Sequence, residues 1–408
     1  MAKHHTSVHS GTLRPDKPLA TGVWMLIIFG CFMIASTSVG STTTQSTIVL
    51  TTIVKQLIFV FGAFVLMKSL ERWASLQLFS SLAKPLCLLW GCTMAACFAF
   101  PGIYGSHAWI QLGPVSLQPS EFGKPLLILL CADAVRQAKR NSGLRRNFSD
   151  CFKTPMLFMA ADAVLLIFQK DYGTLIITLL IGVSCMLIPG WKTLRRTQRR
   201  IILLISSLVI IAVVLIYSGL LSKILVQFPA TSHIAIRIEN MINPYTDIYG
   251  EGYQPANALY SIGSANIFGK GFGNSARKYG YLTQADNDYI LAVTIEETGI
   301  IGLALLLGLY ILVEYRLFWY AFKTRSTAYK VLLCGTAIYL FLHLVLNIGG
   351  VSGLIPMTGI PLLFISSGGS SLWAAATAIG LSQNAICHIR AKEITRRVPH
   401  GRRVLRNV

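Results

Sequence analysis

Ten long apolar runs constrain what this chain can fold into more than any other feature of its sequence. A helix needs about 17–25 apolar residues to cross roughly 30 Å of hydrocarbon, and the runs approach that length. The N-terminal run is too long for a signal peptide and ends without a small-residue cleavage site, which predicts a retained helix. We therefore expect an all-α polytopic membrane protein, with ten membrane-spanning helices over about residues 21–39, 50–68, 84–100, 120–138, 155–169, 172–190, 201–219, 288–314, 328–348 and 366–387.

The composition supports this fold class. Of the 408 residues 53% are hydrophobic and only 13% are charged, whereas a soluble protein carries about a quarter charged residues. A soluble globule and a disordered chain are both excluded by these proportions. The nine cysteines lie mostly within apolar runs and form neither a CxxC pair nor a Cys/His cluster. Disulfide bonds and a zinc site are therefore not expected.

The positive charges predict the orientation of the spans. The net charge is +20, from 36 Lys and Arg against 16 Asp and Glu. No Lys or Arg lies in the connections at 40–49, 101–119 and 349–365. Cytoplasmic loops collect Lys and Arg, so we expect both termini in the cytoplasm, in a multi-pass protein of the inner cell membrane. This topology explains the charge better than nucleic-acid binding does. Of the 36 cations, 28 lie in alternate connections, at 1–20, 68–84, 136–153, 192–200, 316–330 and from Arg390 onward.

One connection is much longer than the others. Residues 220–287 are rich in Gly, Asn and Tyr, and we expect them to form a large extracellular loop between spans seven and eight. The Gly-rich stretch at 263–273 is similar to a phosphate-cradling loop, but no strand precedes it and no Gly-Lys-Ser/Thr follows, which favours simple turns. We expect a single membrane domain over 1–408, with cytoplasmic tails at 1–20 and 390–408.

Ionisable residues within apolar runs are costly and need a reason. Lys55 and Asp133 lie close enough to the ends of their runs to reach the interface or a partner, so we expect structural roles for both. Asp162 lies in the middle of a run, where a cation on a neighbouring helix and a functional role are both open. Glu121 and Lys124 share one helix face, as an internal ion pair or as a polar patch that could hold a phosphate-bearing head group.

A second group of carboxylates lies where the eighth span begins. Asp288 could act as a general base at the outer mouth of this helix or could simply cap its N-terminus. Desolvation would raise its pKa, whereas the helix N-terminus and nearby cations would lower it. Glu296 and Glu297 follow about two turns later.

Five blocks, taken together and in order, resemble the SEDS family (shape, elongation, division and sporulation) of peptidoglycan glycosyltransferases. The family also has ten spans and a large outer loop before the eighth. The blocks are 109–124 (WIQLGPVSLQPSEFGK); 169–174 (QKDYGT); 237–278, which ends in FGKGFGNSARK; 281–299, which contains YLTQADNDY and EETG; and 347–371, which contains PMTGIP and SSGGSS.

The resemblance implies roles for individual residues. The catalytic Asp of the family falls on Asp288, which would take a proton from the 4-hydroxyl of an acceptor lipid II. This oxygen would attack the anomeric carbon of the undecaprenyl-linked donor chain. The resemblance also implies substrate-binding residues. Three cations would stabilise the lipid pyrophosphate, namely Arg237, Lys124 and Lys278. Three further residues would line or shape the cavity, namely Glu121, Gln118 and Ser370.

The sequence departs from the family pattern at four positions. Lys170 replaces a Pro. Ser367 replaces a Tyr and Gly123 stands after Glu121-Phe122, and these two concern local packing. Asp286 replaces the usual His two residues before the catalytic Asp. A second carboxylate there could raise the pKa of Asp288 or, together with Asp288, help to recruit a divalent cation such as Mg²⁺ or Mn²⁺.

The resemblance further implies partners and a cellular role. The substrates would be lipid II and undecaprenyl-pyrophosphate-linked glycan. A class B penicillin-binding protein would supply transpeptidase activity among other membrane proteins of the divisome or elongasome, and no nucleic acid is expected. The GNSARK stretch is closer to the division branch (FtsW) than to the elongation branch (RodA). A lipid II flippase and a divisome scaffold are the alternatives to a polymerase.

Overall fold

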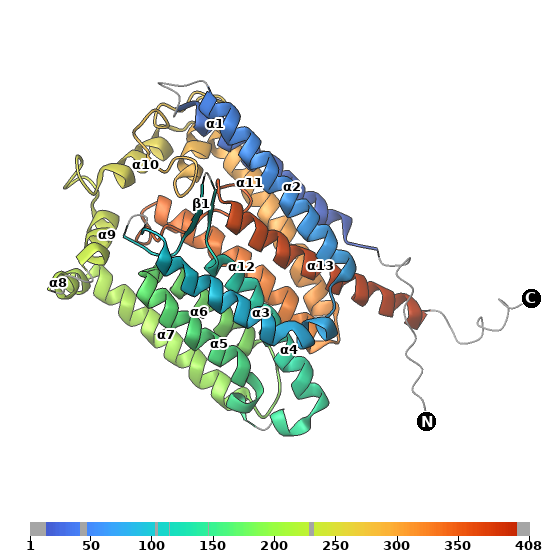
Figure 1. The fold of residues 1–408 in the computed structure, drawn as a ribbon. Helices are drawn as coiled ribbons and strands as arrows, with labels where there is room; N and C mark the ends of the chain where they lie inside the picture. The colour runs from blue at the N-terminus through green and yellow to red at the C-terminus, as the bar shows by residue number, and fades with distance from the viewer. Residues whose placement is uncertain are drawn as a thin grey trace, which may run out of the picture.

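The computed structural model describes residues 14–40, 47–102, 105–113, 115–145, 147–227 and 232–397. Within these residues ten long helices cover the ten predicted spans, and Figure 1 shows them packed as one bundle. They are α1 (Lys17–Gly40), α2 (Thr47–Trp73), α3 (Leu76–Ala96), α4 (Ser120–Arg140), α5 (Phe148–Gln169), α6 (Tyr172–Leu187), α7 (Arg195–Tyr217), α11 (Ile290–Lys323), α12 (Thr327–Val351) and α13 (Gly369–Arg397).

The polytopic membrane class is confirmed, while the number of spans stays a prediction. Seven helices, α1, α2, α3, α5, α7, α11 and α12, are long and apolar enough to cross a membrane, and α6 is a shorter apolar helix. α4 is more polar, but it packs against α3, α5, α6, α12 and α13. Because its neighbours shield it, α4 can carry charged side chains that lipid would not accept.

α7 shows the opposite environment at the edge of the bundle. Gln198 is its one buried residue, and large side chains such as Leu203 and Ile210 are more than half exposed. In a membrane these side chains would contact lipid, which is as apolar as leucine.

The predicted outer loop contains three short helices, α8 (Leu220–Val226), α9 (Ser232–Ile242) and α10 (Tyr253–Ser264). They lie at the end of the bundle opposite the start of α1 and the end of α13 (Figure 1). A small hairpin of β1 (Ile110–Leu112) and β2 (Val115–Leu117) adds antiparallel strands to an otherwise helical fold. Two 3-10 turns, η2 (Cys97–Ala99) and η3 (Ser142–Arg145), complete the described elements.

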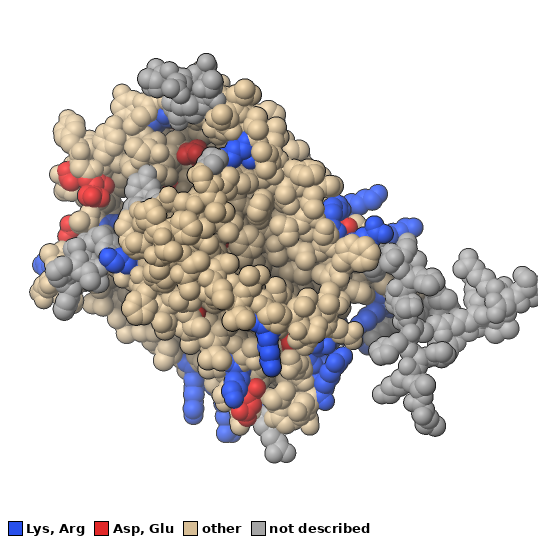
Figure 2. All heavy atoms as spheres, viewed as in Figure 1, with Lys and Arg blue, Asp and Glu red and all other residues tan. Residues whose placement is uncertain are grey.

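The opposite end of the bundle carries the start of α1, the end of α13 and many of the basic residues. Figure 2 shows Lys and Arg side chains gathered along this end. Asp16 is fully buried there and pairs with Arg316 of α11 at 2.6 Å and with Arg390 of α13 at 3.3 Å. This cluster ties the start of α1 to two central helices. α13 continues to Arg397, so the first part of the predicted basic tail is helical, while residues 1–13, 41–46 and 398–408 lie outside the described residues.

Candidate functional site

A polar cavity of about 210 Å³ lies where α4, α6 and α13 begin, at the end of the bundle that carries α8 to α10. Three predicted site residues line it, namely Gln118, Glu121 and Ser370. Lys55 of α2 and Asp171 of α6 line it as well. The first and last resemblance blocks, which are far apart in sequence, therefore meet in one cavity.

Gln118 joins three elements around this cavity. Its backbone N–H donates to Ser370 Oγ at 3.3 Å, and its side-chain Nε2 donates to Asp171 Oδ2 at 2.9 Å. The other oxygen of Asp171 caps α6 by accepting a hydrogen bond from the backbone N–H of Thr174 at 3.1 Å. These bonds fix the N-termini of α4, α6 and α13 relative to one another.

Glu121 and Lys124 form the internal ion pair that their spacing predicts. Lys124 Nζ lies 2.7 Å from Glu121 Oε1, and the two residues are 1% and 2% exposed, respectively. Lys124 also lies 3.1 Å from His343 Nε2. Lys124 is not among the residues that line the cavity, whereas Glu121 is. The second carboxylate oxygen of Glu121, Oε2, is buried and has no hydrogen-bond partner in the described part of the chain.

Lys278 is enclosed in a different cluster. Its ammonium lies 3.0 Å from Glu297 Oε1 and donates to Ser36 Oγ and to the carbonyl of Gly273, and its side chain is 0% exposed. The preceding residue of α11, Glu296, pairs with Lys270 at 2.6 Å. Lys278 therefore neutralises a buried carboxylate and does not line the polar cavity.

The Gly-rich stretch docks onto α11 through its backbone. Lys270 N and Gly271 N donate to the carbonyls of Glu296 and Glu297 at 2.9 and 3.0 Å. Gly269 has a positive φ of 73°, and a Cβ on it would lie 2.3 Å from the Glu297 carbonyl oxygen. Only glycine fits so close an approach. This turn geometry matches the expectation of turns rather than a nucleotide-binding loop.

Asp288 lies in the turn that precedes α11, and this turn is held at every residue. The carbonyls of Asp286, Asn287 and Asp288 accept hydrogen bonds from Ser367 N at 2.8 Å, Ser366 Oγ at 2.9 Å and Asn347 Nδ2 at 3.1 Å. The N-cap of α11 is Tyr289, and no side chain caps this helix. The interpretation of Asp288 as an N-cap is therefore wrong.

The carboxylate of Asp288 adjoins the polar cavity. A Cβ placed on Gly359, which lines the cavity, would lie 3.6 Å from Asp288 Oδ2. Oδ1 is buried without a hydrogen-bond partner among the described residues. Burial raises the pKa of Asp288 to about 6; the positive charge of Arg237 opposes this rise, and the charge of Asp286 adds to it. Arg237 itself donates to the Met357 carbonyl at 3.0 Å.

Asp286 and Asp288 have different electrostatic partners. Burial raises the pKa of Asp286, while hydrogen bonding, including a bond to Ser367, and the charge of Lys55 counteract the rise. Across the described residues, no three His, Cys, Asp or Glu side chains gather where they could hold a metal ion. A cation held by Asp286 and Asp288 alone is a smaller set of ligands than this, so the divalent cation stays a prediction.

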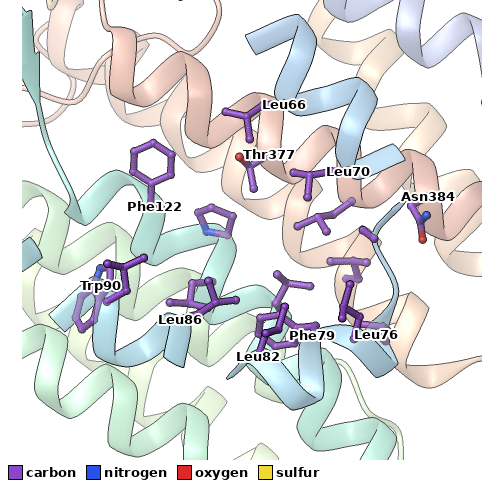
Figure 3. A pocket seen from close by; sticks show the side chains of 18 of the residues that line it. Leu66, Leu70, Leu76, Phe79, Leu82, Leu86, Trp90, Phe122, Thr377 and Asn384 are labelled. Carbon is purple, nitrogen blue, oxygen red and sulfur yellow. The ribbon is translucent and has the colours of Figure 1, made fainter. Parts of the chain in front are cut away.

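An apolar groove of about 460 Å³ runs beside the cavity, between α2, α3, α4, α12 and α13. Figure 3 shows Leu66, Leu86, Trp90 and Phe122 around it, with Asn384 at its far end. The two spaces are separated by residues 117–122. Leu117, Pro119 and Phe122 line the groove, whereas Gln118 and Glu121 line the cavity.

Two further expectations concern buried carboxylates. Asp133 pairs with Arg136 at 2.7 Å, in the structural role expected for it. Asp162 is 2% exposed, and its Oδ1 has no hydrogen-bond partner among the residues that the structure describes. It does not line the polar cavity.

Comparison with known proteins places this chain in a family. A family model described as "Cell cycle protein", which covers FtsW, RodA and SpoVE, matches residues 17–391. The chain belongs to the FtsW/RodA/SpoVE family. The resemblance to the SEDS family is thereby confirmed.

Individual relatives of this family are similar over most of the chain. Three proteins named "Probable peptidoglycan glycosyltransferase FtsW" are among them. That of Bacillus subtilis is 33% identical over 297 residues, covering 72% of this chain and 71% of its own. That of Enterococcus hirae is 32% identical over 286 residues, covering 69% and 68%. That of Halothiobacillus neapolitanus is 28% identical over 408 residues, covering 96% and 92%.

Solved structures share the fold at lower identity. One is a chain from a peptidoglycan synthase complex that coordinates polymerization and crosslinking, with a TM-score of 0.70 and 23% identity, covering 93% of this chain and 99% of that chain. Another is the rod shape determining protein RodA of Thermus thermophilus, with a TM-score of 0.60 and 23% identity, covering 92% and 97%. These structures support the polytopic helical architecture.

Proposed function

We propose that this chain is a peptidoglycan glycosyltransferase that polymerises lipid II, with Asp288 as the general base. The names of its FtsW relatives support the reaction. One structural observation supports the residue: its carboxylate lies in a fixed turn, with Oδ2 next to Gly359, which lines the polar cavity. A general base needs a defined position close to the substrate.

The chemistry follows from the position of this carboxylate. Asp288 takes the proton of the acceptor 4-hydroxyl as the oxygen forms its bond to the anomeric carbon of the donor sugar. The bond between that carbon and the phosphate oxygen breaks, and its electron pair leaves with undecaprenyl pyrophosphate. A base with a pKa of about 6 is ionised at neutral pH and is more basic than an ordinary carboxylate.

The apolar groove provides a path for the lipid part of the substrate. A polyprenyl chain in the groove would place its pyrophosphate at residues 117–122, where the polar cavity begins. Because membrane lipid is as apolar as the leucines of the groove, the groove offers shape and position rather than a hydrophobic driving force.

Orientation and partners belong to the same proposal. The end of the bundle that carries the start of α1, the end of α13 and the basic residues would face the cytoplasm, which puts the cavity at the outer face of the inner membrane. The solved chain from a peptidoglycan synthase complex supports a class B penicillin-binding protein as the transpeptidase partner. The FtsW names of the relatives favour division over a RodA-like role in elongation.

The purified full chain, assayed for polymerisation of lipid II with and without its transpeptidase partner, tests the function. Asp288→Asn should lose glycan synthesis while the protein stays folded. Asp150→Asn is a matched control, because Asp150 is an exposed carboxylate at the start of α5. Full polymer yield from Asp288→Asn would contradict the assigned base. Lipid II translocation in proteoliposomes without polymer would instead favour a flippase.

A divalent cation stays part of the proposal: Asp286 and Asp288 would hold Mg²⁺ or Mn²⁺, which would offset the negative charge of the pyrophosphate. Polymerisation measured after chelation and after return of each ion shows whether the reaction needs one.

A further inference from the structure

The charged side chains that line the polar cavity differ in how many hydrogen bonds and ion pairs they already form. Its charged lining residues are Lys55, Glu121 and Asp171. Asp171 already accepts hydrogen bonds from Gln118 Nε2 and Thr174 N, and one oxygen of Glu121 is paired with Lys124. Lys55 forms no ion pair with a carboxylate in the part of the chain that the structure describes. Its charge acts on Asp286 from a distance, but no carboxylate contacts its ammonium, which can therefore contact a ligand in this cavity.

The other candidate cations are less available. Lys124 and Lys278 are buried, and each neutralises a buried glutamate within 3.0 Å. Removing either lysine would leave a buried carboxylate unpaired, so both already have a structural use. Arg237 is exposed and holds the Met357 carbonyl beyond the cavity lining. Among the described lining residues, Lys55 is thus the one Lys or Arg that faces the cavity.

The wall of the cavity has two further features that describe the ligand. α13 begins at Gly369, and Ser367 to Ser371 line the cavity; a helix N-terminus favours phosphate. Independently, the buried Oε2 of Glu121 has no donor among the residues that the structure describes. A buried acceptor without a partner is costly unless a ligand donor reaches it. The ligand should therefore carry both an anionic group and a hydroxyl or amide donor.

We propose that Lys55 binds the pyrophosphate of the lipid-linked sugar in the polar cavity, while Glu121 Oε2 accepts a hydrogen bond from the sugar. This assignment rests on the proposed glycosyltransferase function and specifies its substrate site. The ammonium of Lys55 also lies 5.7 Å from the centroid of the Phe59 ring, which lines the cavity too. It would stabilise the negative charge of the departing pyrophosphate as well as bind it.

The test compares Lys55→Met, which keeps the length of the side chain without its charge, with Lys55→Arg. The readouts are the KM for lipid II and inhibition of polymerisation by undecaprenyl pyrophosphate. Lys55→Met loses a charge-assisted hydrogen bond to the pyrophosphate. The inhibition constant of undecaprenyl pyrophosphate should therefore be about ten- to hundredfold higher for this variant than for the wild type. Lys55→Arg should restore most of the inhibition, because a guanidinium also binds phosphate. Lys68→Met is the matched control, since Lys68 lies on the same helix but pairs with Glu71.

The outcomes separate this proposal from the one on which it rests. Wild-type inhibition in folded Lys55→Met would overturn the role of Lys55 and leave the glycosyltransferase function standing. If the wild-type chain makes no polymer, the function fails, and the role of Lys55 is then tested directly from the binding of undecaprenyl pyrophosphate to both variants in detergent. A structural role alone would lower the unfolding temperature of Lys55→Met equally with and without this ligand, which would also overturn the proposal.

Discussion

Two clusters of Lys and carboxylate side chains lie at the same end of the bundle, and they differ in how completely their charges are satisfied. In the first cluster Glu296, Glu297, Lys270 and Lys278 pair with one another and with nearby serines. In the second, the polar cavity, Glu121 and the adjoining Asp288 each keep an oxygen that has no hydrogen-bond partner within the described part of the chain. The first cluster fixes the outer segment onto α11, and the second is open to a substrate. Residue type alone does not separate these two uses.

The largest expected effect is on the rate of polymerisation, after a change in the second cluster. Asp288→Asn should lower polymerisation by about 10²–10⁴-fold, the usual contribution of a general base. Its stability should not fall, because a carboxylate whose pKa is raised by burial gives the folded state its stability below the unfolded pKa and loses it as the pH rises through about 6. Initial rates of polymerisation and thermal unfolding of the same preparation check both statements.

A change in the first cluster, in which the charges are paired, should lower stability rather than rate. Glu297→Gln leaves the ammonium of Lys278 buried without its carboxylate, so the free energy of unfolding should fall by about 3–5 kcal/mol. Unfolding in denaturant, compared with Glu239→Gln on the exposed face of α9, measures this loss. A stable Glu297→Gln variant with poor activity would contradict the separation of the two clusters.

The pH dependence of the reaction should sharpen the role of Asp288. Since its pKa is raised to about 6, the base form is lost as the pH falls, and the rate at pH 5 should be about a tenth of its plateau. This fall in rate at low pH should appear in kcat/KM measured from pH 5 to 8, with thermal unfolding at each pH as a control that the protein stays folded. A flat profile through this range would argue against Asp288 as the base.

The smallest effect is expected for an ion pair that belongs to neither cluster. Lys68 and Glu71 of α2 are 3.0 Å apart with side chains 42% and 14% exposed. Glu71→Gln should therefore change the free energy of unfolding by at most about 1 kcal/mol. A larger loss would show that exposed ion pairs stabilise this bundle nearly as much as the buried pairs of the first cluster.

The sequence predicts most of the fold because spans are local features. An apolar run of about the right length forms a helix wherever it lies, and each predicted run corresponds to a helix among the described residues. The exceptions have a physical reason. α8, α9 and α10 lie in a segment without a long apolar run, and the hairpin of β1 and β2 is too short to show an alternating pattern.

The site is only partly predictable for a different reason. Gln118, Glu121 and Ser370 meet as expected because the resemblance blocks retain their order. The direction of a lysine depends on how its helix is rotated against its neighbours, which a single sequence does not show. Lys124 and Lys278 therefore turn inward to buried glutamates, while Lys55, which we expected to be structural, lines the cavity. A lone cation near the start of an apolar run, on the same predicted side of the membrane as Asp288, was the available signal.

The thin partition made by residues 117–122 has a consequence for selectivity. Neighbouring side chains face the groove and the cavity in turn, so the two spaces are only one layer of chain apart. A substrate that reaches around this partition from the groove into the cavity must carry its charge directly beside its apolar tail. Polyprenyl pyrophosphates have this arrangement, whereas soluble nucleotide sugars carry a base and a ribose at that point. The partition would thus exclude the cell's water-soluble sugar donors by the order of their parts, without a residue dedicated to rejecting them.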